Sequence, residues 1–471
     1  MTKESSSKTK FRDFPTTYWL IILFEFFERG AYYGMNSIIS ICMINELGFS
    51  KIETASIRGT VQPFLYFLPL LTGAIADRLG YRRMLFIAFS FLGTGYFLIS
   101  QTSNYWAVFA SMMIMGIGAG IFKPIIPGTI SKVVDEKHSS LGFGTYYWAI
   151  NLGAFIFPLI IVPYLKSMNW RYVLIASAIS TGAMIIPTLL FFKEPQREKI
   201  ENESLIETFS GIFKKIIMVF LDWRFMLFII IYSLFWVLYF QQSDSVLWYV
   251  KDFVDTRPID NFINGIFGTQ WHFDVEHVTV INAGTIIALQ LIISAMVKNL
   301  KALPTMIIGV ATATVGMAIL ALSSNIWIFI AGMFIFSIGE MTAHPKYFAY
   351  LGMIAPEDKK ATYTGFGFLY GFFGASVGSF LGAKLYVTFV DNPMYKFIGT
   401  KLSLINPASY LPSTATIAEA LKIAEKAGIS RSEIAASAST RELWLIFSAI
   451  GLISVIGLAL YGKYIGEHKK G

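Results

Sequence analysis

Long apolar stretches separated by short polar ones run along the chain from Phe14 to Tyr464. A helix needs about 20 mainly apolar residues to cross a hydrocarbon core roughly 30 Å thick. The pattern predicts twelve such helices, over residues 15–45, 54–76, 84–101, 105–133, 141–163, 171–192, 223–250, 277–297, 304–322, 326–354, 361–390 and 441–463. Stretches such as 326–338 and 449–460 are apolar on every face, which is not the alternation of a transmembrane barrel. We therefore expect an all-α membrane protein.

The predicted helices fall into two sets of six. One set fills residues 1–192, and the other lies in residues 223–471, with a long segment at 391–440 expected outside the membrane. Without that segment the two halves have the same size. Such parallel halves, each with internal inverted repeats, are how many secondary transporters build a site near the membrane midplane. We expect two six-helix bundles joined by a cytoplasmic linker, residues 193–222.

The linker and the outer segment each have helical signals of their own. In the linker, apolar residues recur at helical spacing, which predicts an amphipathic helix on the inner membrane surface: Leu205, Ile206, Phe209, Phe213, Ile216, Ile217 and Phe220. A tether between the halves is favoured over a gate. In 391–440, Thr416 with Glu419 and Ser430 with Glu433 have the capping-box spacing, which predicts two short helices, the first over 417–426. A solvated cap is favoured over a lid or a partner-docking element.

Composition and charge support membrane insertion and suggest an orientation. Hydrophobic residues make up 55% of the chain and charged residues 14%, against about a quarter charged in soluble proteins. With the N-terminus in the cytoplasm, 22 Lys and Arg lie inside, whereas only 6 lie in short outer loops, namely Lys51, Arg58, Lys166, Arg171, Lys251 and Arg257. The positive-inside rule then places both termini in the cytoplasm, so the net charge of +8 indicates topology rather than nucleic-acid binding.

The N-terminal segment and the single cysteine are both consistent with a membrane protein of this kind. The polar N-terminus leads into a charged apolar run without a small-residue cleavage site, so we expect a retained first helix and no signal peptide. The single Cys42 lies inside an apolar run and excludes an intramolecular disulfide. We expect it to be a packing residue.

The loop between the second and third predicted helices holds a dense motif, Gly73-Ala-Ile-Ala-Asp77-Arg78-Leu-Gly80-Tyr-Arg82-Arg83. The glycines allow close backbone approach, and Asp77 can accept charge-assisted bonds from an arginine or from a helix N-terminus. We expect Gly73, Asp77 and Arg78 to form a latch between two helices on the inner face. The motif resembles the loop 2–3 signature of the major facilitator superfamily, which implies that fold.

Ionisable residues inside predicted helices are few, and each costs free energy at membrane depth unless it serves a function. Leaving aside Lys384 near the outer end of the eleventh helix and charges at the very ends of helices, they are Glu25, Glu28, Arg29, Lys123, Asp244, Glu340, His344 and Lys346. On the first helix, Glu25, Glu28 and Arg29 share a polar stripe with Tyr32, Tyr33 and Asn36. The two acids there balance Arg29 and Lys123, as mutual pairing requires. Functional use is favoured over a purely structural salt-bridge network.

The stripe, Glu25-Phe-Phe-Glu28-Arg29-Gly-Ala-Tyr32-Tyr33, resembles the signature of the proton-dependent oligopeptide transporter (POT) family. Phe122-Lys123-Pro124 and Ile150-Asn151-Leu-Gly153 are similar to two further motifs of that family, and single positions match nearly along the whole membrane domain: Tyr66, Phe235, Trp236, Gln241, Asn282, Ala283, Gly339 and Glu340.

The resemblance implies roles for these positions. Glu25, Glu28 and Glu340 are implied as proton-coupling acids, and Arg29 and Lys123 as contacts of a substrate carboxylate. The implied cavity lining is Tyr32, Tyr33, Tyr66, Asn151 and Trp236, with Asn282 and Glu340 at the substrate's amino end.

Several positions depart from the family pattern. Phe240 stands where the family has a carboxylate and Asn36 where it has an arginine, a joint loss that leaves neither charge buried alone. Asp244, a turn further out, either replaces that gate by meeting Lys51 or Arg58 or is a solvated helix end. Ile125 and Gly367 alter the pocket's shape.

Two ionisable residues near Glu340 have open assignments. His344 either joins Glu340 as a second titrating site or is a hydrogen-bonded structural histidine. Lys346 is expected to extend toward the inner surface rather than to bind substrate.

The resemblance, together with the two-bundle pattern, implies a proton-coupled symporter that imports di- or tripeptides across the cell's inner membrane by alternating access. A substrate carboxylate that competes for Arg29 and Lys123 raises the proton affinity of the glutamates, which links the two bindings. We expect a monomer in the lipid bilayer with peptide and protons as partners, and neither a cofactor, a metal site, enzymatic activity nor nucleic-acid binding. The alternatives are a relative that carries another carboxylate-bearing solute and a non-transporting sensor that uses residues 391–440.

Overall fold

The computed structural model describes residues 14–135, 138–195, 205–405, 411–412 and 415–465, and these are almost entirely helical. The first half contains α1 Thr16–Asn36, α2 Ile39–Asn45, α3 Lys51–Leu79, α4 Tyr81–Gln101, α5 Tyr105–Val133, α6 Ser139–Ile156, a π-helical segment Phe157–Ile161, α7 Val162–Met168, α8 Trp170–Gly182 and α9 Ile185–Leu190.

The linker forms α10 Leu205–Leu221. The second half contains α11 Trp223–Phe240, a 3₁₀ turn Gln241–Ser243, α12 Ser245–Phe253, α13 Arg257–Phe267, α14 His277–Val297, α15 Ala302–Ile319, α16 Ile326–Ile354, a 3₁₀ turn Glu357–Lys359, α17 Lys360–Phe366, α18 Leu369–Tyr386, a π-helical segment Val387–Asp391, α19 Asn392–Ile405, α20 Ile417–Lys426, α21 Arg431–Ala436 and α22 Thr440–Tyr464.

Within the described residues, twelve helical segments are long enough to cross a membrane. Eleven of them are also apolar enough by length and composition. The twelfth is α1, whose 21 residues give about 30 Å at 1.5 Å per residue. It departs from the others because Glu25, Glu28 and Arg29 lie within it. The predicted all-α fold with twelve spans is confirmed.

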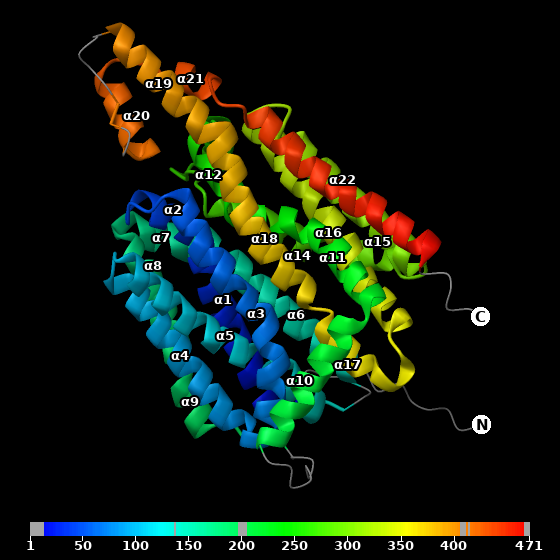
Figure 1. Cartoon of the computed structure of the whole chain (residues 1–471). Helices are drawn as coiled ribbons and strands as arrows, with labels where there is room; N and C mark the ends of the chain where they lie inside the picture. The colour runs from blue at the N-terminus through cyan, green and yellow to red at the C-terminus, as the bar shows by residue number, and fades with distance from the viewer. Residues whose placement is uncertain (1–13, 136–137, 196–204, 406–410, 413–414, 466–471) are drawn as a thin grey trace, which may run out of the picture.

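The two halves lie side by side, the first coloured blue to green and the second green to red in Figure 1. Each has its own hydrophobic core. The halves meet chiefly where α3 packs against α18 and α6 packs against α14.

Four of the predicted continuous helices are interrupted in the described chain. Those over 171–192 and 361–390 have short turns between α8 and α9 and between α17 and α18, and two others are broken at polar residues. The first ends at Asn36 and resumes as α2 at Ile39, and the seventh is interrupted around Asp244, whose φ of −130° and ψ of −97° are not helical. The breaks at Asn36 and near Asp244 are in contact with each other, because the Asn36 amide donates a hydrogen bond to Ser243 Oγ at 2.9 Å. A hydropathy pattern cannot show such breaks because the flanking residues stay apolar.

The linker contains the predicted amphipathic helix. Phe213, Ile217 and Phe220 of α10 are exposed on one side, while α10 contacts α3 in the first half and α11 and α17 in the second. The expected side chains Leu205, Ile206 and Phe209, and residues 196–204, lie outside the described parts. Position and contacts fit a tether between the halves.

The segment 391–440 differs from the expectation at its start. Span 11 does not end at residue 390 but continues through the π-helical segment into α19, to Ile405. The two short helices are confirmed as α20 and α21. The capping box forms at Thr416 and Glu419 but not at Ser430, whose hydroxyl pairs with Ser432, because Glu433 instead forms an ion pair with Lys401.

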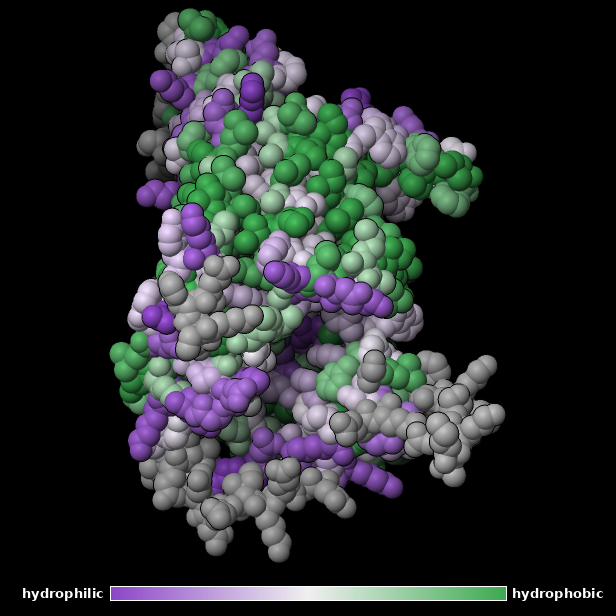
Figure 2. Space-filling view, turned by 90° about the vertical axis from the view of Figure 1, so that its right-hand side faces the viewer, coloured by the Kyte–Doolittle hydropathy of each residue, from purple (hydrophilic) through white to green (hydrophobic). Residues whose placement is uncertain are grey.

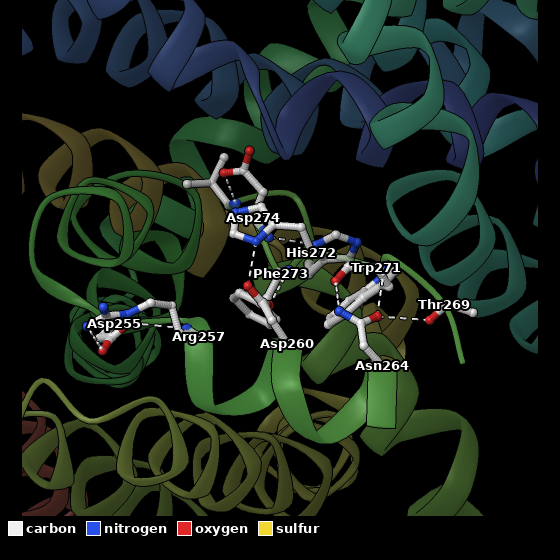
Figure 3. A network of polar contacts seen from close by, with 11 residues as sticks. Asp255, Arg257, Asp260, Asn264, Thr269, Trp271, His272, Phe273 and Asp274 are labelled. Carbon is white, nitrogen blue, oxygen red and sulfur yellow. Dashed lines mark hydrogen bonds and ion pairs between the residues drawn. The ribbon is translucent and has the colours of Figure 1, made fainter. Parts of the chain in front are cut away.

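An additional helix, α13, was not predicted. Figure 3 shows how polar contacts fasten it to the segment that leads into α14. His272 contacts Asp260 at 2.5 Å, and Asn264 accepts from the Trp271 amide at 2.6 Å. The signals for it are Pro258 in its first turn and Gly268 at its end, with φ of +63°.

Candidate functional site

The polar stripe of α1 forms an ion-pair cluster inside the first half. Arg29 contacts Glu28 at 2.5 Å and Glu25 at 3.4 Å, and the two glutamates are 0% and 3% exposed. The guanidinium also lies over the Tyr32 ring at 5.4 Å. Among the described residues, Arg29 is the cation in direct contact with both buried carboxylates. The predicted pairing of the glutamates is therefore observed for Arg29.

Lys123 has different partners from those expected. No acid of the described chain lies within ion-pairing distance of its ammonium, which instead sits 4.3 Å from the Tyr66 ring centroid and 5.9 Å from that of Phe368. It still interacts electrostatically with Glu25 and Glu28. The expectation that it pairs directly with a glutamate is wrong: the direct contacts of the glutamates are with Arg29, and the buried Glu28 Oε1 has no hydrogen-bond partner among the described residues. An uncompensated cation at this depth is suited to receive an anion.

A second acidic position lies in the other half. Asn282 of α14 donates to Glu340 of α16 at 2.8 Å and to Ser337 Oγ at 2.9 Å. Glu340 is 8% exposed, and it has no ion-pair partner among the described residues. The two positions that the resemblance assigns to a substrate's amino end are thus brought into contact.

Aromatic side chains form a wall between these two polar positions. Trp236 stacks on Tyr370 with ring centroids 4.4 Å apart, and its ring centroid lies 4.5 Å from that of Tyr239. Tyr66 of the first half contacts Tyr370 at 6.1 Å, so the wall reaches across both halves. Tyr239 and Tyr370 were not among the predicted site residues; a lone tyrosine on an apolar helix is indistinguishable from a packing residue.

The remaining predicted lining residues lie on helices of the first half. Tyr32 and Tyr33 are half-buried on α1 with ring centroids 5.4 Å apart. Asn151 is buried, and its amide donates to the carbonyl of Tyr147, one turn earlier on α6. The Asn151 side-chain amide therefore hydrogen-bonds within its own helix.

His344 lies at the aromatic wall and not against Glu340. Its Nδ1 is 3.4 Å from the Tyr232 hydroxyl, and its ring packs against Trp236 at 5.3 Å. Lys346 is buried and donates to the carbonyls of Lys298 and Leu300, at 3.2 and 2.8 Å. These contacts favour the structural assignment of His344, and they make Lys346 a cap for the end of α14 instead of a freely extended side chain.

The surface is hollowed between the halves on the side that lies to the right in Figure 1. Figure 2 shows this hollow between the upper, C-terminal half and the lower, N-terminal half, with hydrophilic residues at its rim. This is the end at which the described chain begins and ends. Solvent can therefore enter between the halves from that end.

The opposite end is held closed by a buried ion pair. Arg58 Nε of α3 lies 2.6 Å from Asp244 Oδ1, and both side chains are almost fully buried. Of the open alternatives for Asp244, the contact with Arg58 is the one formed, whereas Lys51 pairs with Asp391 at 2.7 Å. Arg58 is thus not a loop cation, as the charge count took it, but part of the closed outer face.

A third ionic contact between the halves is formed by α7. Lys166 of α7 binds both Asp274 and Glu276, at 2.6 and 2.7 Å. Burial raises the pKa of Glu276 above its usual range, although Lys166 acts against it. At Asp274 burial is outweighed by Lys166, which lowers the pKa of that carboxyl. The pKa values of the two acids are therefore shifted in opposite directions, upward for Glu276 and downward for Asp274.

The inner-face motif does not form the latch in the expected way. Asp77 accepts from Lys132 Nζ and from the Tyr81 hydroxyl, both at 2.8 Å, so its partners are neither an arginine nor a helix N-terminus. It ties α3 to α5 within one half because the halves are apart at this end. A Cβ on Gly73 would meet Pro124 at an ordinary 3.6 Å, so close approach does not require glycine there. Arg78 likewise extends from the end of α3 in the same half.

Comparison with known proteins gives the family. The family model of the Major Facilitator Superfamily matches residues 19–379. The chain belongs to the major facilitator superfamily. Its members' twelve-helix architecture is the one seen here.

Within this superfamily, the similarities favour peptide transporters. Dipeptide and tripeptide permease A of Klebsiella pneumoniae (strain 342) is 28% identical over 193 residues, which cover 40% of this chain and 38% of that permease. The chain thus spans well under half the length of the curated relative it matches. The predicted resemblance to the POT family is confirmed at this level.

Solved structures agree in fold over nearly the whole chain. A POT family transporter in complex with 5-aminolevulinic acid has a TM-score of 0.73 at 19% identity, covering 96% of this chain and 98% of that one. Peptide transporter POT in complex with sulfate has a TM-score of 0.71 at 16% identity, covering 97% and 96%. The chain therefore shares its fold with these POT transporters.

Proposed function

We propose that this chain is a proton-coupled symporter that imports short peptides across the cell's inner membrane, with both termini in the cytoplasm. The observation that carries the proposal is the unequal pairing of the two cations of the first half. Arg29 binds both glutamates, whereas Lys123 has no acid within ion-pairing distance among the described residues. The permease names of the relatives support the same substrate class.

The proposed binding mode follows from charge. A peptide carboxylate approaches Lys123 first, because its ammonium is the cation without a direct acidic partner. The peptide's amino group is attracted to Glu340, which Asn282 orients. The aromatic wall around Trp236 then contacts the substrate between its charged ends. The complexes with sulfate and 5-aminolevulinic acid are properties of the similar transporters; they support anion binding in this fold.

Proton coupling is proposed to occur at the Arg29 cluster. A substrate carboxylate that draws Arg29 toward itself weakens the pairs with Glu25 and Glu28. A buried carboxylate without its counter-ion favours protonation, so substrate and proton binding reinforce each other. Each positive charge moved inward gains about 2.3 kcal/mol per 100 mV of membrane potential, which drives accumulation.

One alternative substrate class is favoured by a specific feature. Phe240 packs against Tyr66 and Trp236 where the family pattern has a carboxylate. The altered pocket suits another solute with a carboxylate and an apolar body. A non-transporting sensor is the remaining alternative.

Reconstituted vesicles distinguish these functions. With an imposed pH gradient, inside alkaline, we expect a labelled dipeptide to accumulate above its equilibrium level, and a proton ionophore to abolish the accumulation. A competition panel of dipeptides, tripeptides, carboxyl-amidated peptides and peptide-free carboxylates then defines the substrate. Competition by peptide-free carboxylates alone contradicts peptide transport, and binding without flux contradicts transport of any kind.

A further inference from the structure

A groove of about 1530 Å³ lies in the second half, away from the candidate site. It is bounded by the ends of α11, α16 and α22 and by the connection from α14 to α15. All of these segments lie at the end of the molecule where the described chain begins and ends. The positive-inside rule places this end at the cytoplasmic membrane surface.

The groove has a strong excess of positive charge. Five cations line it, namely Arg224, Lys298, Lys301, Lys346 and Lys463, with Asp222 as the acid. None of the five forms an ion pair within the described chain. Asp222 is already engaged, because its carboxylate caps α11 at the Phe225 amide and accepts from the Tyr363 hydroxyl at 2.9 Å.

Two buried polar groups of the groove retain unused hydrogen-bonding capacity. The Tyr350 hydroxyl is buried, and no described residue is its partner. Lys346 uses its ammonium on two carbonyls, and an ammonium has three protons to donate. An anion bound here would find donors that are already oriented.

The other wall of the groove is apolar and faces the membrane. It includes Leu303, Ile307, Ile308 and Met353, of which Ile308 is 59% and Met353 is 72% exposed. Both belong to membrane-crossing helices, α15 and α16. A ligand here can therefore place an anionic group among the cations and hydrocarbon against this wall.

We propose that the groove binds an anionic phospholipid of the inner leaflet, with its phosphate among the cations and its acyl chains along Ile308 and Met353. Basic pockets between transmembrane helices on the cytoplasmic side bind anionic lipid headgroups in this way. The chain's own ends do not fit electrostatically. Residues 1–13 and 466–471 each contain more basic than acidic residues.

The test measures lipid binding to the purified full chain in detergent. Phosphatidylglycerol and phosphatidylcholine are compared by native mass spectrometry and by the lipid-dependent rise in Tm. We expect wild type to retain phosphatidylglycerol preferentially. Lys298→Gln with Lys301→Gln removes two cations and should weaken binding roughly 25-fold, at about fivefold per cation. The matched control, Lys359→Gln with Lys360→Gln, alters two exposed lysines at the start of α17 outside the groove and should bind as wild type does.

Tyr350→Phe tests the groove without changing charge. Loss of a hydrogen bond to a charged group should weaken binding about tenfold. Equal retention of both lipids by wild type overturns the proposal, as does equal weakening by the two double variants, which would indicate general surface charge. If the Lys298 and Lys301 variant does not fold, the wild-type lipid preference and Tyr350→Phe still decide the question.

Discussion

Arg29 and Lys123 occupy the same half but in different electrostatic situations. Arg29 holds two buried glutamates, the tighter contact being with Glu28, while Lys123 rests on aromatic rings. A cation over a ring face gains about 1–2 kcal/mol, less than a direct buried pair supplies. In the proposed binding mode, an arriving anion therefore binds Lys123 at the lowest cost, and its approach weakens the pairs between Arg29 and the two glutamates.

Replacement of Glu28 should separate coupling from binding. Glu28→Gln keeps the shape of the side chain but cannot release or take up a proton, so uptake driven by a pH gradient should fall to the leak seen in empty vesicles. Exchange of internal for external peptide needs no net proton movement and should persist. Glu46→Gln, at an exposed acid after α2, serves as the control and should transport normally. Driven uptake by the Glu28 variant would contradict the coupling scheme.

Lys123 is expected to contribute to affinity through the substrate carboxylate. Lys123→Gln removes a charge-assisted hydrogen bond of about 1.5–3 kcal/mol, so the half-saturating dipeptide concentration should rise roughly ten- to a hundredfold. A carboxyl-amidated dipeptide has no charge to lose and should bind both proteins equally weakly. Competition against one labelled peptide measures both effects. An equal loss for free and amidated peptides would mean that Lys123 acts on structure alone.

At the scale of helices, α15 and α16 pack with little space between their backbones. A Cβ on Gly339 would collide with the amide nitrogen and side chain of Ala313, whereas one on Gly352, further along the same helix, meets nothing within 4 Å. The tight contact places Glu340 at the interior face of α16. Packing therefore fixes where this acid points.

Gly339→Ala should destabilise the second half by about 1–3 kcal/mol, the usual cost of overpacking. Gly352→Ala is the matched control and should be neutral or slightly stabilising, since alanine favours helix. Lowered Tm in detergent for the first variant alone is the expected outcome. Equal Tm values for the two variants would show that α15 and α16 can move apart freely.

The sequence predicted those elements whose signals are local. The twelve spans follow from apolar length, and α20 follows from Thr416 and Glu419. The extension of α18 into α19 was missed because Asn392-Pro393 resembles the end of a helix, since proline removes a helical hydrogen bond. In the structure the π-helical segment Val387–Asp391 directly precedes this proline and the helix continues. The interruption at Asp244 depends on a partner, Arg58, that lies far away in the chain. The sequence could offer that contact only as one alternative, because proximity across halves has no local signature.

In the candidate site, too, contacts within one helix were predictable and contacts between helices were not. The Arg29 cluster was predictable because Glu25 and Glu28 lie within one turn or so of the arginine on one helix face. The aromatic partners of Lys123 were not, since Tyr66 and Phe368 come from two other helices. Nor could the sequence show that Asp77 would bind Lys132, because the two residues lie on different helices, 55 positions apart in the chain.

For the whole molecule, the ionic contacts between halves gather at one end while the other end is hollowed (Figure 2). In the proposed transport cycle, with both termini in the cytoplasm, this arrangement corresponds to the inward-open state. In that state Glu276 is buried beside Lys166, whereas separation of the halves at the outer end would expose it to solvent.

Closure of the outer end should therefore depend on pH through Glu276. Burial raises the pKa of Glu276 in the closed state, so protonation of Glu276 favours closure. This stabilisation of the closed state is complete at pH values below the ordinary glutamate pKa, and it is lost as pH rises through the raised pKa. Asp274 opposes this only at lower pH, because its pKa is depressed. Spin labels on Glu46→Cys and Gly265→Cys, in a Cys42→Ser background, should report a shorter distance in mild acid. Glu276→Gln should abolish that dependence, and an unchanged pH response would assign it elsewhere.

The buried pair of Arg58 and Asp244 should set the balance between the closed and open outer face. Removal of one partner leaves an uncompensated buried charge, which costs about 3–5 kcal/mol. Since opening returns that charge to water, the cost falls on the closed state. A shift of about 3 kcal/mol changes the ratio of the two states by more than a hundredfold. Asp244→Asn and Arg58→Gln should each lengthen the distance between the same two labels, and the double variant, which buries no lone charge, should return toward the wild-type distance. If both single variants keep the short distance, the aromatic and helical contacts of α3 with α18 close this end without the ion pair.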